Sequence, residues 1–269
     1  MYVQTKDGLG LLAADSDISC QPVKDYKRPF PSARRYITEE DAKHIFKILC
    51  GPSPWLHFLR PNLNTHLVDL PKDRPIRIVN DGEFNKNYRG FFGKSPSKDT
   101  RGFVDRKNAT IYLEEFPPKS RGTSLAGLAL HEAVHLFSHP PGKSKQLRAT
   151  AYGYLGEGLI EGLTQVITED IQTRQNIKPL PEMWQAYKEY TPVARRFIRI
   201  FSPEIVGDAY FNGNLSQLSK IIERRWTQDN FLRLKTLAAQ KKTDEALGLI
   251  DKLEKEYSRK PQYYRWTFR

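Results

Sequence analysis

The sequence predicts a predominantly helical α+β fold, with a small sheet in the N-terminal half and helices through the C-terminal half. Two observations support this. Short runs of β-branched and aromatic residues lie between residues 76 and 113, as strands require. Beyond residue 123 the segments are helical in pattern, and Pro or Gly marks most of their junctions. A chain of 269 residues can bury a sizeable core as one large domain or two.

The N-terminal third contains few regular patterns. Residues 1–35 lack periodicity and carry several prolines, which predicts a loose leader. Thr38 is a suitable N-cap because acidic residues follow it, so we expect a helix that ends near Cys50, before Gly51-Pro52. Residues 84–101 are rich in Gly and Lys and are expected to form a loop.

Three strands are expected before the central helices. Residues 76–79 form a short apolar run. Residues 102–105 and 109–113 flank the polar turn 106–108, which predicts a hairpin.

The segment from Thr123 to Phe137 contains the pattern His131-Glu132-Ala133-Val134-His135. Residues four apart lie on one face of a helix, so both imidazoles can reach one metal ion. Glu132 can then reach a water molecule at that metal, as in hydrolytic zinc sites. The alternative is a pair of core histidines satisfied by hydrogen bonds, since the helix is apolar nearly all round.

A third ligand is expected downstream, where Glu157 and Glu161 are also four residues apart. The pattern at residues 131–135 is an HExxH motif. Together with this pair of acids it resembles the gluzincins, zincin metallopeptidases whose third ligand is a Glu on a second helix. The resemblance implies zinc bound by His131, His135 and Glu157, with Glu161 orienting a ligand histidine. Spacing alone cannot choose between adjacent turns, so Glu161 as the ligand remains open.

Other third ligands fit less well. His139 would spread three ligands over two straight turns, and Pro140-Pro141 follows it at once. Cys20 and Cys50 are 30 residues apart and read as unpaired thiols, with no disulfide framework.

Helices are expected near residues 182–190, 192–201, 203–211, 215–226, 228–240 and 243–257. We therefore expect three parts: a leader over 1–35, a zincin-like metallopeptidase domain over 36–215, and a helical extension over 216–269 packed on that domain. The zincin-like label follows from the resemblance, which covers about residues 100–215.

The same stretch is similar to zinc-protease domains of bacterial toxins and effectors, including cargoes of injection systems, and loosely to anthrax lethal factor. The resemblance implies a zinc-dependent endopeptidase with Glu132 as general base. The oxyanion of the transition state needs a further donor, for which Tyr210 and Tyr154 are the candidates, with Tyr152 also considered. In zincins an edge strand just before the HExxH helix binds the substrate backbone, and 109–113 is expected in that role.

The net charge of +12 and the pI of about 9.6 favour acidic partners, either a protein substrate or a delivery or loading partner. The basic segments 94–106 and 143–148 flank the expected strand and zinc helix. Nucleic acid is unlikely as a partner because no nucleic-acid-binding motif occurs. The sequence contains no run of 18 apolar residues, so no transmembrane helix is expected. We expect synthesis in a reducing cytoplasm, with any secretion or injection by a route without a cleaved signal peptide.

Two other functions stay open. One is a zinc-stabilised binding module without catalysis, against which the intact Glu132 argues. The other is a basic nucleic-acid-binding protein with an incidental HExxH, against which the Glu157/Glu161 pair argues.

Overall fold

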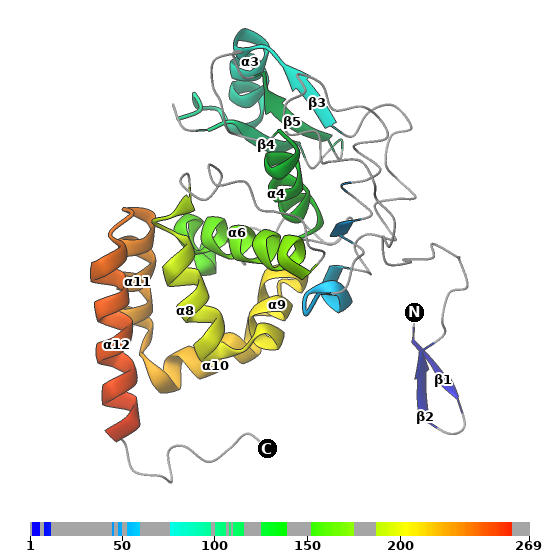
Figure 1. Cartoon of the computed structure of the whole chain (residues 1–269). Helices are drawn as coiled ribbons and strands as arrows, with labels where there is room; N and C mark the ends of the chain where they lie inside the picture. The colour runs from blue at the N-terminus through cyan, green and yellow to red at the C-terminus, as the bar shows by residue number, and fades with distance from the viewer. Residues whose placement is uncertain are drawn as a thin grey trace.

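The structure is a computed structural model of the chain, shown in Figure 1. The residues that it describes are 2–5, 8–11, 45, 48–49, 53–59, 76–97, 100–105, 108, 110–115, 125–138, 152–174 and 187–259. The predominantly helical α+β class is confirmed. A small sheet and one helix from the N-terminal half form the upper part of the view. The helices of the C-terminal half form the lower part, and helix α4 (Leu125–Phe137) runs between the two.

The sheet that bears on the site has three strands, β3 (Ile76–Val79), β4 (Gly102–Asp105) and β5 (Thr110–Glu114). Their order is β3-β5-β4, with β5 parallel to β3 and antiparallel to β4. The predicted hairpin of β4 and β5 is confirmed. The prediction that 109–113 is the edge strand is wrong, because β5 pairs on both sides and all five of its residues are buried. The outer strand beside the HExxH helix is β4.

Residues 81–92 form helix α3 (Asp81–Phe92), so the loop predicted for 84–101 is wrong over its first half. The helix begins where the Asn80 side chain accepts a hydrogen bond from the Glu83 backbone N–H at 2.9 Å. It ends at Gly93, whose left-handed φ of 68° suits a glycine C-cap. Aromatic packing of Phe84 and Tyr88 against Phe103 of β4 outweighs the weak helix propensity that the composition suggested.

Helix α4 (Leu125–Phe137) carries the HExxH motif and packs against both β4 and β5. It lies on the sheet face opposite α3, since Phe103 points towards α3 while the next residue back, Gly102, faces Glu132 of α4. The described part of the helix from Gly127 to Phe137 is buried throughout, as its apolar composition predicts. Two histidines and a glutamate are therefore held in a nearly dry environment.

Helix α6 (Glu157–Arg174) crosses α4 and carries the second pair of acids. Its two glycines permit close packing with neighbouring helices. A Cβ on Gly158 would lie 2.5 Å from the Ala238 carbonyl carbon, and one on Gly162 would lie 2.7 Å from the Tyr190 oxygen. The repeated Glu-Gly of residues 157–162 thus places the helix backbone directly against its neighbours, which fixes the direction of the acids.

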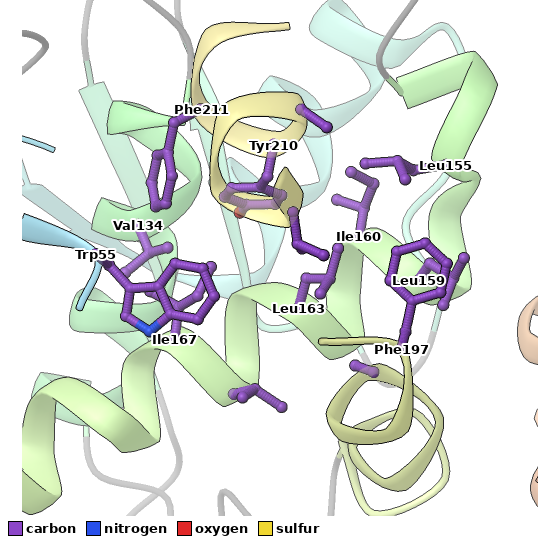
Figure 2. Packing of buried hydrophobic residues seen from close by; sticks show 14 of the residues in the cluster. Trp55, Val134, Leu155, Leu159, Ile160, Leu163, Ile167, Phe197, Tyr210 and Phe211 are labelled. Atoms are coloured by element: carbon purple, nitrogen blue, oxygen red, sulfur yellow. The ribbon is translucent and has the colours of Figure 1, made fainter. Parts of the chain in front are cut away.

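Of the helix predicted near 182–190, residues 187–190 are described and are mainly turn, and the rest lies outside the described residues. The five helices predicted after it are confirmed as α8 (Thr191–Phe201), α9 (Pro203–Asn212), α10 (Ser216–Arg225), α11 (Gln228–Ala239) and α12 (Thr243–Arg259). Helix α6 contacts α8 and α11, and α12 contacts both α8 and α11. Figure 2 shows Leu159, Leu163 and Ile167 of α6 in one apolar core with residues of α4, α8 and α9. The helices of the predicted extension therefore support the helix that bears the acids.

At the N-terminus, β1 (Tyr2–Thr5) and β2 (Gly8–Leu11) pair as an antiparallel hairpin within the predicted leader. Of the helix predicted from Thr38 to Cys50, Ile45, Ile48 and Leu49 are described, and all three are helical and buried. His139, Cys20, Cys50 and the basic segment 143–148 lie outside the described residues. None of the described helices is long and apolar enough to span a membrane.

Candidate metal centre

Helices α4 and α6 bring His131, His135 and Glu161 together. One ligand atom from each residue lies within 4.8 Å of the others. The two Glu161 oxygens divide between the histidines: Oε2 is 3.4 Å from His131 Nε2, and Oε1 is 3.4 Å from His135 Nε2. Both imidazoles thus present the same nitrogen to one carboxylate.

The spacing of these atoms suits a tetrahedral metal ion. Ligand bonds of about 2.0–2.1 Å at tetrahedral angles separate the ligand atoms by about 3.3 Å. His131 Nε2 is also buried, and its 3.4 Å contact with Glu161 Oε2 is longer than a normal hydrogen bond. A buried polar atom with only so weak a contact is costly, and a metal ion would satisfy it. Two imidazole nitrogens and a carboxylate are a donor set that zinc accepts.

The other ring nitrogen of His131 belongs to a chain of polar contacts through the core. Nδ1 lies 3.1 Å from Gln165 Oε1, and Gln165 Nε2 donates to Glu169 Oε1 at 2.9 Å. Arg195 of α8 donates in turn to Glu169. Because Glu169 accepts from the amide nitrogen, the amide oxygen must face the ring. His131 then carries its proton on Nδ1 and leaves the Nε2 lone pair for a metal.

A second set of contacts orients His135. Thr164 Oγ1 donates to the Ile160 carbonyl at 2.8 Å, so its lone pairs face the other neighbours. His135 Nδ1 lies 3.3 Å from Thr164 Oγ1 and 3.1 Å from the Tyr152 hydroxyl oxygen. The ring therefore donates through Nδ1 as well, and its Nε2 also becomes available as a ligand.

In the absence of metal, the negative charge of Glu161 and the positive charges of the histidines stabilise one another. Burial raises the pKa of Glu161, but the positive charge of His135 and hydrogen bonds to both histidines outweigh it and lower that pKa strongly. Burial lowers the pKa of His131, but the hydrogen bond and charge of Glu161, with the charge of Glu132, raise it overall. Protons thus compete with a metal ion for the same nitrogens.

Glu132 occupies the side of α4 that faces the outer strand. It is buried, with 6% of its surface exposed. Its side chain lies against Gly102, where a Cβ would be 2.7 Å from Glu132 Oε1. The predicted general base therefore lies at the start of the strand that would bind an extended peptide.

The structure separates the two acids of α6. Glu161 joins the histidines, whereas Glu157 is exposed and lies outside the cluster. This arrangement favours the alternative that the spacing left open, with Glu161 rather than Glu157 as the third ligand. The residue four positions after the acid in the cluster is Gln165, which occupies the orienting position expected of Glu161. Both roles have moved by one helical turn.

The two tyrosines expected to stabilise an oxyanion lie elsewhere. Tyr210 is fully buried, and its hydroxyl oxygen is 2.5 Å from Thr164 Oγ1, behind the Nδ1 side of His135. Tyr154 packs on Phe231 of α11, with ring centroids 5.2 Å apart. Tyr210 therefore lies on the Nδ1 side of His135, and Tyr154 packs towards α11.

Tyr187 contacts the site, and the charges of the site also reach Tyr88; neither residue was expected at the site from the sequence. The Tyr187 ring stacks on His131, with centroids 4.4 Å apart. Burial raises the pKa of Tyr187 well above its usual value, and the charges of Glu161 and Glu132 raise it further. Burial also raises the pKa of Tyr88 on α3, as do the charges of Glu157, Glu161 and Glu132. Both hydroxyls stay protonated near the carboxylates and can donate hydrogen bonds.

The sequence contained a signal for Gln165, since it continues the four-residue spacing of Glu157 and Glu161. It contained none for Tyr187, which reaches the site only through the packing of distant segments. No protein-family model, curated protein or solved structure matches this chain. The functional argument therefore rests on the geometry of the site and on the motif.

Proposed function

We propose that this protein is a zinc-dependent peptidase that hydrolyses peptide bonds of a protein substrate. One observation carries the proposal: His131, His135 and Glu161 converge from two helices, with the Glu132 carboxylate beside them and next to an outer strand. The family likeness of the motif to toxin and effector proteases supports a macromolecular substrate.

His131 Nε2, His135 Nε2 and a Glu161 oxygen would hold the zinc ion. When bound, zinc supplies Lewis-acid activation of water and of the scissile carbonyl. Glu132 accepts the proton of the attacking water and passes it to the leaving amine. Gln165 and Thr164 hold the two imidazoles in the tautomer that keeps Nε2 unprotonated.

Tyr187 is the residue that we propose to stabilise the oxyanion. Its ring stacks on that of His131, with centroids 4.4 Å apart. Its raised pKa keeps the hydroxyl protonated, so that it can donate a hydrogen bond to developing negative charge.

The substrate backbone is proposed to pair with β4 in place of the 109–113 strand. Outer strands can accept an extended peptide, whereas a strand paired on both sides cannot. Gly102 of β4 contacts Glu132, so a peptide along this strand would pass next to the general base.

Metal analysis and a catalytic substitution test the proposal together. Purified wild-type protein should contain one zinc per chain and cleave members of a random peptide library. Glu132→Gln should retain zinc and fold while losing hydrolysis by about a hundredfold or more, because the base is removed and the ligands stay. A protein that holds zinc but cleaves no peptide would instead support the zinc-stabilised binding module. Equal cleavage by wild type and Glu132→Gln would show that Glu132 is not the base.

A further inference from the structure

Two exposed phenylalanines lie beside the outer strand. Among the described residues, the large apolar side chains with high exposure are Phe91 at 44%, Phe92 at 47% and Leu232 of α11. Two of the three are thus neighbours at the end of α3. Exposed apolar patches frequently mark binding surfaces.

These side chains extend an aromatic cluster onto β4. Phe91 and Phe92 lie 5.7 and 5.8 Å from the Phe103 ring, centroid to centroid. Phe92 also lies 4.5 Å from the Tyr88 ring. We define Tyr88, Phe91, Phe92 and Phe103 as the aromatic patch. Phe103 anchors it in the strand, and the two phenylalanines are its accessible part.

The patch lies on the face of β4 opposite Glu132, one residue further along the strand. Phe103 follows Gly102, the residue that contacts Glu132. Successive residues of a strand point to opposite faces of a sheet. A peptide paired with β4 would alternate in the same way, so a side chain next to the one facing the metal site would project over the patch.

Basic side chains near the patch favour ligands with negative charge. Lys86, Arg89 and Lys94 are exposed in the second half of α3 and just beyond it. Arg89 precedes Phe92 by three residues, which makes the two side chains neighbours on the helix surface. Arg77 lies 6.0 Å over the Tyr112 ring, which Phe91 also approaches at 6.1 Å. Acidic side chains of a bound peptide would be attracted here.

We propose that the aromatic patch is a specificity site for the substrate. Its occupant is an extended, acidic peptide segment with a large apolar side chain adjacent to the position that faces the metal. The inference rests on the proposed peptidase function and adds the chemistry of the residues that the site selects.

Paired peptides test this specificity. Cleavage of a randomised octapeptide library by the zinc-loaded wild-type protein would identify a preferred sequence. Two peptides would then be compared, one with Phe and one with Ala at the selected apolar position. We expect wild type to prefer the Phe peptide by about 10- to 100-fold in kcat/KM. Phe91→Ala/Phe92→Ala should remove most of that preference through a higher KM, while Leu232→Ala should retain it.

Binding separates failure of this inference from failure of the peptidase function. Labelled forms of both peptides would be titrated into the full-length Glu132→Gln protein, with and without the two Phe substitutions. Cleavage by wild type with unchanged preference in the double variant would overturn the patch and leave the peptidase standing. If wild type cleaves no peptide of the library, the labelled pair would be acidic octapeptides with Phe or Ala at one central position. Patch-dependent binding of the Phe form would then overturn the peptidase and support the patch. Acidic neighbours should strengthen binding at low salt, and a preference for basic neighbours would contradict the charge argument.

Discussion

Gly102 and Glu132 are in such close contact that the strand has no room for a side chain at this position. A Cβ on Gly102 would lie 2.7 Å from Glu132 Oε1 and 2.9 Å from its Cγ. The outer strand and the general base are therefore positioned by one another, although 30 residues separate them in the sequence.

Gly102→Ala should displace the Glu132 carboxylate and lower kcat by about 10- to 100-fold, since displacements near 1 Å carry costs of that order. Zinc content should not change, because none of the three proposed ligands is substituted. Gly248→Ala on α12 is the matched control, since its Cβ would meet nothing within 4 Å. Steady-state kinetics and zinc analysis check this; equal kcat in all three proteins would show that the contact does not position the base.

Replacing each of the two acids of α6 by alanine in turn should distinguish their roles. Glu161→Ala should weaken zinc binding by more than the roughly 10- to 100-fold typical of an orienting residue, because a ligand is lost. Glu157→Ala is the control on the same helix face and should bind zinc with nearly wild-type affinity, since it lies outside the cluster. Zinc titration against a chelator measures both constants. The opposite ranking would restore Glu157 as the ligand.

Gln165→Leu should remove the acceptor for His131 Nδ1–H while retaining most of the side-chain volume. We expect zinc affinity to fall by roughly 10- to 100-fold, because the ring loses the partner that fixes its tautomer. At a pH above the raised pKa of His131, imidazole ¹⁵N shifts should report a mixture of tautomers in the metal-free variant and a single one in wild type. Unchanged shifts and affinity would show that Gln165 has no orienting role.

Zinc affinity should decrease as the pH falls. Glu161 raises the pKa of His131 in the metal-free protein, so that its imidazole binds a proton over a wider pH range than a free histidine does. Zinc must displace that proton, so binding should weaken progressively below the raised pKa and reach its plateau above it. Isothermal titration at several pH values, in buffers of different ionisation enthalpy, measures the protons released. No proton release near neutral pH would contradict the histidine–carboxylate cluster.

The sequence pattern was sufficient to predict features that depend on residues close to one another in the chain. The HExxH spacing puts His131 and His135 on one face of α4 in any helical context. The helices from α8 to α12 were predictable because prolines, glycines and polar caps mark their ends. The hairpin of β4 and β5 was predictable from its short polar turn.

Tertiary structure decided what depends on packing between distant segments. Glu157 and Glu161 have equivalent spacing, and the choice between them follows from how Gly158 and Gly162 seat α6 against α11 and α8. The edge strand depends on β3 pairing with β5 from 30 residues away. Tyr187 reaches His131 only through the fold, because rotation and approach of helices are set by side-chain packing that no local pattern records.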